Sequence, residues 1–420
     1  MALVFDNRQN LQPGEPGIHA LIAGVSFYKH LPGGDGPPSE IDWGLPQLSA
    51  TALTAFKIYR WLIDRRKQLP RKLATVRLLL SPSEAEAPKI TQGMAEINQL
   101  LAGEGVTLID TPSPCTLDNF AGEARQWRKD AISDIDDSNV TFFYFAGHGI
   151  QRKNNDPVLL VEDFGNPNAG MVAKTVEFNA LFEGMAPLKD PLKKMARTQL
   201  YFVDACRVRP EDLTKYRFPS IADIFDVELG GEDKRSAPVF YATVSNTKAY
   251  AKSGQQTLFS EALLDCLDGF AGTPTNEEDA DGYAKYAVSI YSLAEALNAK
   301  MEAIRSLNVD QEFYPTSGGR DDVIVNLTKP PEVDCTLHVE PDPAARLVSV
   351  NLQDSVGTEV PGWTLAPVDP NPHRGLLRAG FYHLEAKITN PPQPPYVDRK
   401  KQIVNITPLK GFELKARMTS

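Results

Sequence analysis

The sequence predicts a mostly parallel α/β sheet flanked by helices, followed by a small all-β domain. Residues 15 to about 328 alternate strand-like and helix-like segments, which is typical of a parallel sheet with helices on both faces. Two near-continuous apolar runs, at 140–146 and 198–203, have the composition of strands buried on both faces. Beyond Lys329-Pro-Pro, short alternating runs indicate a sandwich of immunoglobulin-like type. We therefore expect domains at 1–328 and 332–420.

The individual elements follow from local periodicity and from the turn residues between them. In the first domain we expect strands at 75–80, 140–146 and 198–203, and helices at 49–68, 91–101 and 116–132. In the second domain we expect strands at 335–340, 346–353, 362–368, 375–388 and 402–406. The acidic stretch 273–282 lacks the ligand pattern and terminal Glu of an EF-hand, so we expect a solvated loop.

Each of the two central apolar runs ends in a residue able to do covalent chemistry. The first leads into Gly147-His148-Gly149, and the second leads into Asp204-Ala-Cys206. Reactive groups of open α/β sheets gather at the carboxyl ends of the strands, where both residues are expected. A Cys or a Gly-His-Gly turn taken alone more often serves packing, so the pairing and the order of the two carry the prediction.

An imidazole beside a thiol suits nucleophilic catalysis. His148 would accept the proton of Cys206 and later protonate the leaving amine. The backbone N–H groups of Gly149 and Cys206 would form an oxyanion hole. Neither role needs a third side chain.

These residues resemble the caspase-like peptidases, which include caspases, metacaspases and their bacterial relatives. In that family a His-Gly element precedes the Cys element by roughly 50 residues, and the spacing of His148 and Cys206 is similar. The segments 19–28, 237–245 and 254–264 resemble the first strand, the strand after the nucleophile and the helix that follows it. The resemblance implies a cysteine endopeptidase with a protein substrate.

The resemblance also implies a specificity for basic residues. Metacaspases carry Asp-Xaa-Cys, whose Asp belongs to the pocket for the side chain before the cleaved bond, and Asp204 stands at that position. A carboxylate there favours Arg, and less strongly Lys. Where metacaspases place a second acid in an Asn-Asp-Ala segment, this chain has Ala50-Thr51-Ala52. The pocket therefore holds one acid or borrows another.

The segment between Cys206 and residue 237 is long, charged and without clear periodicity. In the resembling family an activation or processing segment lies here, and Lys234-Arg235 is the expected self-cleavage point. The alternative is a solvated loop whose charges only keep it soluble.

Composition narrows the class of protein. The chain has 420 residues, 42% of them hydrophobic, and a formal net charge of −10, which disfavours nucleic-acid binding as a main role. No signal segment or membrane-length apolar run is present, so we expect a cytoplasmic protein without a membrane partner. Cys115, Cys266 and Cys335 have no metal-ligand spacing, and we expect them to serve packing. We expect no cofactor or bound metal, although calcium stays open because several metacaspases need it.

The sequence thus predicts a cysteine endopeptidase that cleaves after Arg or Lys. Accessory domains in bacterial caspase-like proteins imply a regulated effector in stress or anti-phage defence, switched on by a small-molecule or protein activator. Two alternatives stay open. One is a catalytically silent caspase-like scaffold. The other is a sensor whose sandwich binds a nucleotide signal, although no phosphate-binding Gly-rich loop supports it.

Overall fold

The fold was analysed in a computed structural model, in which the chain divides into two compact units. Unit 1 comprises residues 1–264 and 297–322, and unit 2 comprises 265–296 and 323–420. The structure describes residues 2–41, 44–109, 111–153, 156–170, 172–206, 225, 230, 232–243, 256–280, 282–306, 314–316, 320–388, 399–410 and 412–418.

Unit 1 is built on an eight-stranded mixed sheet with the strand order β15-β12-β11-β6-β2-β3-β1-β4. The five consecutive strands from β12 to β3 are parallel, and the outer strands β15, β1 and β4, of which β15 and β4 form the edges, are antiparallel to their neighbours. The bounds are β1 Leu3–Asp6, β2 Gly17–Val25, β3 Lys72–Ser81, β4 Thr107–Leu108, β6 Val140–Gly147, β11 Thr198–Ala205, β12 Val239–Tyr241 and β15 Tyr314–Thr316. The predicted parallel sheet is therefore confirmed.

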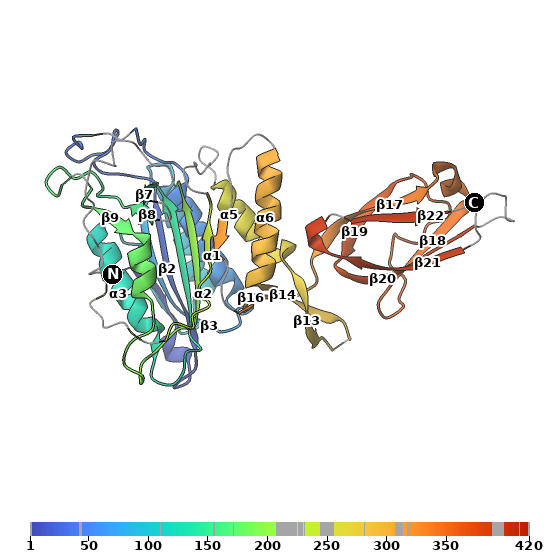
Figure 1. Cartoon of the computed structure of the whole chain (residues 1–420), viewed down its shortest axis with the longest axis horizontal. Coiled ribbons are helices and arrows are strands. Elements are labelled where there is room, and N and C mark those ends of the chain that lie inside the picture. The colour runs from blue at the N-terminus through green and yellow to red at the C-terminus, as the bar shows by residue number, and fades with distance from the viewer. Residues whose placement is uncertain are drawn as a thin grey trace. The chain divides into compact units, whose positions relative to one another are not determined.

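Helices cover both faces of this sheet (Figure 1). The helices are α1 Thr51–Arg65, α2 Ala87–Leu101, α3 Leu117–Ala131, α4 Phe178–Gly184, α5 Leu258–Asp265 and α6 Ile290–Ser306. On one face, α1 approaches β2 so closely that a Cβ on Gly24 would lie 2.6 Å from the Cβ of Ala55. On the other face, Trp127 of α3 donates its indole N–H to the carbonyl of His19. Each face of β2 is thus buried, as its mostly apolar sequence predicts.

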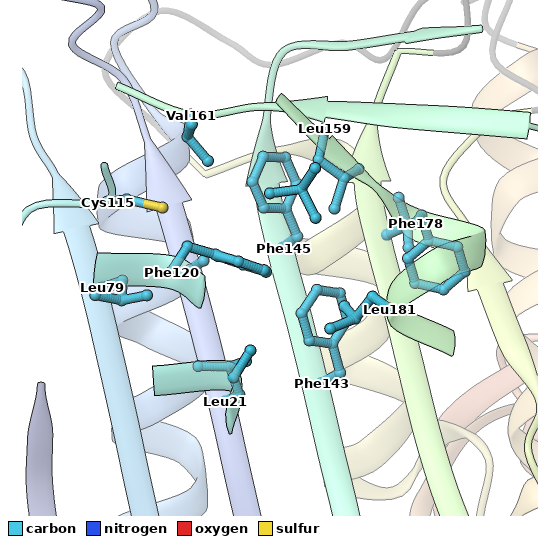
Figure 2. Packing of buried hydrophobic residues seen from close by; sticks show 14 of the residues in the cluster. Leu21, Leu79, Cys115, Phe120, Phe143, Phe145, Leu159, Val161, Phe178 and Leu181 are labelled. Atoms are coloured by element: carbon cyan, nitrogen blue, oxygen red, sulfur yellow. The ribbon is translucent and has the colours of Figure 1, made fainter. Parts of the chain in front are cut away.

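The largest side chains gather on the α3 and α4 face of the sheet. Figure 2 shows Phe143 and Phe145 of β6 between Phe120 of α3 and Phe178 of α4. Phe143 lies within 6.4 Å, ring centroid to ring centroid, of both helical phenylalanines. Alternate residues of β6 therefore anchor one face, which leaves the intervening residues, Tyr144 among them, for the opposite face. The two sets of β6 side chains therefore point to opposite faces of the sheet.

Two smaller sheets complete unit 1. They pair β10 Lys194–Met195 with β5 Ile132–Ser133, and β7 Gly149–Lys153 with β8 Asp156–Leu160 and β9 Thr175–Glu177. Because β7 starts directly after His148, the chain turns out of the main sheet at that residue.

Unit 2 begins earlier than the boundary expected at Lys329-Pro-Pro. A hairpin precedes α6, with β13 Thr273–Glu278 antiparallel to β14 Ala284–Ser289, and β14 also pairs with β16 Val323–Leu327. This pairing ties residues 273–289 to the segment that enters the C-terminal strands. The expected loop at 273–282 was also wrong, because residues 273–278 form a strand. Their exposed, mostly polar side chains hid this strand from a search based on apolar periodicity.

The rest of unit 2 consists of two three-stranded sheets, ordered β19-β17-β22 and β18-β20-β21. Their bounds are β17 Glu332–Glu340, β18 Val348–Asp354, β19 His373–Arg378, β20 Gly380–Ile388, β21 Arg399–Ile406 and β22 Phe412–Arg417. Residues of both sheets form one buried cluster, which includes Leu337, Leu352, Leu384 and Leu414. The predicted all-β architecture is confirmed. The strand expected at 362–368 is not present as such: only Leu365 makes an isolated bridge, to Val350.

Within the described residues, no helix combines the length and the apolar character needed to span a membrane.

Candidate active site

The register of the central sheet brings His148 and Cys206 together. Strands β6 and β11 are parallel neighbours, and their last aligned pair is Gly147 with Ala205. His148 and Cys206 are the next residues on each strand, and adjacent strands lie about 4.8 Å apart. The hydroxyl of Tyr144 donates to Asp204 Oδ2 at 2.8 Å, so these two side chains share a face. His148 and Cys206 directly follow the ends of these two strands.

A backbone carbonyl sets the tautomer of His148. The Nε2 atom lies 2.7 Å from the carbonyl oxygen of Pro46. Because a carbonyl oxygen can only accept, Nε2 must carry the proton of this hydrogen bond. In the neutral ring, Nδ1 is then the basic nitrogen, which is the form a general base requires.

Tyr28 fixes the position of His148 from a second side. Its hydroxyl oxygen accepts a 2.7 Å hydrogen bond from the His148 backbone N–H, and the two rings lie 4.9 Å apart, centroid to centroid. His148 is buried, and this burial lowers its pKa below the usual 6.5 despite the opposing effect of the Pro46 carbonyl. The imidazole is therefore neutral at pH 7 and available to accept a proton.

Gly149 packs so closely against the end of β11 that there is no room for a side chain at this position. A Cβ added to Gly149 would lie 2.5 Å from the carbonyl oxygen of Cys206 and 2.8 Å from the Cβ of Ala205. The Leu160 N–H donates to the carbonyl of His148, which makes Gly149 and Leu159 a pair without mutual hydrogen bonds. The N–H of Gly149 therefore points away from β8.

Asp204 is completely buried beside this pair. Its Oδ2 accepts hydrogen bonds from the hydroxyls of Tyr144 and Thr257, whereas Oδ1 has no hydrogen-bond partner among the residues that the structure describes. The backbone N–H of Thr257 donates to Thr54 Oγ1 of α1. This hydrogen bond holds Thr257 against the helix. Burial raises the pKa of Asp204 to about 6, against the lowering effect of its two hydroxyl donors. A buried carboxylate oxygen without a donor is suited to receive a cation or an N–H group.

A buried carboxylate does lie at the start of α1, but it belongs to another segment of the chain. Thr51, which stands near the expected acidic position, begins α1, and the buried carboxylate at this helix start is Glu86. Glu86 Oε1 accepts from the Leu53 N–H and the Ser26 hydroxyl, and Oε2 accepts from the N–H and hydroxyl of Ser83. With both oxygens occupied, Glu86 caps α1.

The expected processing residues have very different environments. The Lys234 side chain is 65% exposed and pairs with Glu232. The Arg235 side chain is only 6% exposed and pairs with Asp233 at 2.8 Å. It also donates to the carbonyl of Phe182, with its guanidinium 4.7 Å from the centroid of that ring. Residues 207–224 and 226–229 lie outside the described part of the chain.

Sequence reasoning missed four contributors to this site: the Pro46 carbonyl, Tyr28, Tyr144 and Thr257. A backbone carbonyl leaves no trace in residue type. Tyr144 left a weak signal, because it puts a hydroxyl into a run otherwise rich in Phe, four residues before His148.

The other cysteines lie in the cores. Cys115, Cys266 and Cys335 are each at most 2% exposed, and none of the four cysteines, all of which are described, forms a disulfide. Burial raises the pKa of the Cys115 thiol, which disfavours a reactive thiolate there. The described ranges also contain no group of three or more His, Cys, Asp or Glu residues placed to hold a metal ion.

Comparison with known proteins identifies a family whose sequence model matches this chain. The caspase-domain family model (Peptidase_C14) matches residues 94–318, which is more than half of the chain. The uncharacterized protein y4kE of Sinorhizobium fredii is 28% identical over 217 residues, and the match covers 51% of this chain and 59% of that protein.

Two solved structures are similar in outline. Protein GSU0716 of Geobacter sulfurreducens has a TM-score of 0.41 at 14% identity, and covers 73% of this chain and 95% of its own. Caspase-1 of Spodoptera frugiperda has a TM-score of 0.38 at 13% identity, and covers 74% of this chain and 90% of its own. The family match confirms the expected resemblance, and the chain belongs to the caspase-domain family.

Proposed function

We propose that this protein is a cysteine endopeptidase that cleaves peptide bonds after Arg, and less efficiently after Lys. The observation that supports the proposal is the parallel register of β6 and β11, which lead directly into His148 and Cys206, together with the hydrogen bond from Nε2 of His148 to the Pro46 carbonyl. This arrangement leaves Nδ1 as the base. Family membership supports peptidase chemistry, and the residue roles and the specificity are our proposal.

The proposed reaction proceeds through an acyl-enzyme. Cys206 gives its thiol proton to His148 Nδ1, and the thiolate attacks the carbonyl carbon of the substrate. The resulting oxyanion accepts hydrogen bonds from the N–H groups of Gly149 and Cys206. The C–N bond then breaks while His148 protonates the amine, which leaves a thioester on Cys206. Water, deprotonated by His148, attacks the thioester to release the acid and restore the thiol. These steps need no metal or cofactor for their proton and electron balance.

Asp204 is the proposed specificity residue. Its free Oδ1 would accept the guanidinium of an Arg substrate, and its ionised form supplies the opposite charge. Because the carboxylate is only 1% exposed, a substrate reaches it only after the groups that cover it rearrange. This burial supports a resting form that requires activation, in line with a regulated effector in bacterial stress or anti-phage defence.

The first experiment compares fluorogenic peptides that end in Arg, Lys or Asp. Wild type, Cys206→Ala and Asp204→Asn are each assayed with added calcium and with a chelator. We expect cleavage after Arg that is lost in Cys206→Ala. Cleavage after Asp would refute the role of Asp204, and calcium dependence would reopen a metal requirement.

A silent wild type calls for a second measurement. An Arg chloromethyl ketone alkylates a competent thiolate even when turnover is slow, and mass spectrometry locates the adduct. Modification of Cys206 that requires His148 would identify a latent peptidase. If neither cleavage nor modification occurs, the same two measurements are repeated after incubation with cell extract, and continued silence there favours a silent caspase-like scaffold.

A further inference from the structure

Unit 1 contains a second polar cleft, at the opposite end of β11 from Cys206. Its volume is about 320 Å³, and it lies next to the first residue of the strand, Thr198. The walls come from the segments 187–197 and 232–235, together with Asp137. The cleft is thus separate from the candidate active site, but it includes the end of the segment that connects Cys206 to β12.

The lining of this cleft has more basic than acidic residues, although Lys193, Lys234 and Arg235 form ion pairs with Asp134, Glu232 and Asp233. Six basic side chains face three carboxylates, those of Asp137, Asp190 and Glu232. The basic residues are Lys189, Lys193, Lys194, Arg197, Lys234 and Arg235. In a protein with a net charge of −10, a concentration of positive charge in one cleft produces a local field that attracts small anions.

The buried Nε–H group of Arg197 is a second, independent indication of an anion site. Its Nε atom is buried and has no hydrogen-bond partner in the described part of the chain. A buried guanidinium N–H without an acceptor is costly, and in native proteins it commonly marks the place of a ligand or ion. Phosphate oxygens are strong acceptors for this group.

The backbone around Arg197 is firmly held. Its N–H donates to the carbonyl of Asp137 at 2.9 Å, and its carbonyl accepts from the Ser236 N–H at 2.8 Å. Pro187 and Pro191 stiffen the opposite wall. The cleft therefore exists before any ligand arrives, which lowers the entropic cost of binding.

The cleft is connected to the segment that follows the nucleophile. Arg235, in the cleft wall, is seated on Phe182 of α4. Phe225, from the middle of the same segment, is buried against Gly184 at the end of α4, with the guanidinium of Arg128 5.5 Å from its ring centroid. Helix α4 thus holds this segment at two points, one of which contributes to the cleft.

We propose that this cleft binds a small molecule carrying two or more phosphate groups, and that the bound ligand holds the 232–235 end of the segment after Cys206. The guanidinium and ammonium groups match phosphate chemistry. The volume suits a small molecule, and the net charge of −10 disfavours a long polyanion such as nucleic acid.

The test measures binding of inorganic tripolyphosphate to full-length Cys206→Ala protein by calorimetry, so that the result does not depend on catalysis. We expect saturable binding of one ligand per chain. Arg197→Gln should weaken binding at least about tenfold, and Lys194→Gln should weaken it about threefold, because the exposed lysine is better solvated. Lys285→Gln, which removes a similar charge from the hairpin of unit 2, should leave affinity unchanged.

Two results would overturn the proposal. One is the absence of saturable binding at physiological salt. The other is equal affinity of the Lys194 variant, the Lys285 variant and the parent for tripolyphosphate. This second comparison still tests the proposal if Arg197→Gln fails to fold. A glutamate-rich peptide that binds more tightly than tripolyphosphate at this cleft would replace the phosphate assignment with a peptide site.

Discussion

Two buried histidines lie at opposite ends of neighbouring strands, and they differ in what surrounds them. His19, near the start of β2, hydrogen-bonds Thr75 Oγ1 through Nδ1 at 2.9 Å, and Thr75 in turn contacts Asp130. Asp130 and Glu123 form close ion pairs with the buried Arg77. His148, beyond the end of β6, is held by a backbone carbonyl, and the neighbouring strand β11 leads into Cys206.

The difference teaches that burial alone does not identify a reactive histidine. Burial lowers the pKa of both residues, to about 4 for His19. His19 belongs to a network of hydroxyl and charged groups that ties β2, β3 and α3 together. His148 instead has one nitrogen occupied and the other left for chemistry. The partner of each ring nitrogen separates a structural histidine from a candidate base.

The largest expected effect is a loss of activity on replacing His148 that replacing His19 does not cause. Cys206→Ala and His148→Ala should each lower kcat/KM on an Arg peptide at least about 10³-fold with little change in Tm. His19→Ala should lower stability by about 1–3 kcal/mol and keep kcat nearly unchanged in the folded protein. Peptide kinetics and thermal melts measure both. Equal losses of activity in the fully folded His19 and His148 variants would remove the distinction.

The next effect tests the close packing at the reactive end of the sheet. Gly149→Ala should cost about 1–3 kcal/mol of stability, because its Cβ would collide with the Cys206 carbonyl. The shift of the proposed oxyanion donor should also lower kcat about 10²-fold. Gly122→Ala is the matched control. It has open space around its Cβ and lies within α3, so about 1 kcal/mol of stabilisation is expected. Urea unfolding and kcat of both variants decide the outcome.

A third prediction concerns the charge of Asp204. Its pKa of about 6 means that the carboxylate gains a proton as the pH falls through 6, so kcat/KM on Arg peptides should decline there. Asp204→Asn should lower kcat/KM on the Arg peptide about 10²-fold and remove this acid limb. A norleucine peptide, which carries no charge, should be cleaved equally by both proteins. An unchanged Arg preference in Asp204→Asn would place the specificity elsewhere.

The smallest expected effect is a difference in the pH dependence of stability. His19 has a folded pKa of about 4, so the unfolded chain binds more protons between pH 4 and 6.5, and this group makes stability rise with pH. Asp204 has its pKa raised from 3.8 to about 6, so the folded chain binds more protons there, and stability falls with pH. Each effect is about 3 kcal/mol at most, and they oppose one another.

Single variants should separate the opposing contributions of His19 and Asp204 to the pH dependence of stability. Stability of Asp204→Asn should rise from pH 4.5 to 6, stability of His19→Gln should fall over the same interval, and wild type should stay nearly flat. Urea unfolding at several pH values measures this. Three parallel curves would contradict the opposing contributions.

The two central strands were predictable because apolar runs bounded by special residues report both strand formation and burial. The runs at 140–146 and 198–203 became β6 and β11 with ends shifted by one or two residues. Their parallel adjacency followed from the alternation of strands and helices.

Other features were beyond the reach of sequence patterns. The strand β13 carries exposed polar side chains, and its pairing with β14 satisfies its backbone without apolar periodicity. Residues 362–368 have alternating character, yet within the described chain the segment makes only one bridge, from Leu365 to Val350 at the edge of the sheet. The burial of Arg235 depends on Phe182, which is more than fifty residues away in the chain.

The Pro46 carbonyl has a consequence for how such a protein is mutated. Every amino acid carries a backbone carbonyl, so no replacement of the Pro46 side chain removes the acceptor that orients His148. Alanine scanning and saturation mutagenesis would therefore report this position as permissive whenever the loop keeps its path. Its contribution becomes visible only when the main chain itself is altered, by an insertion between residues 44 and 48 or by an amide-to-ester exchange that weakens the acceptor. Tolerance in a mutational map is thus compatible with a direct part in catalysis.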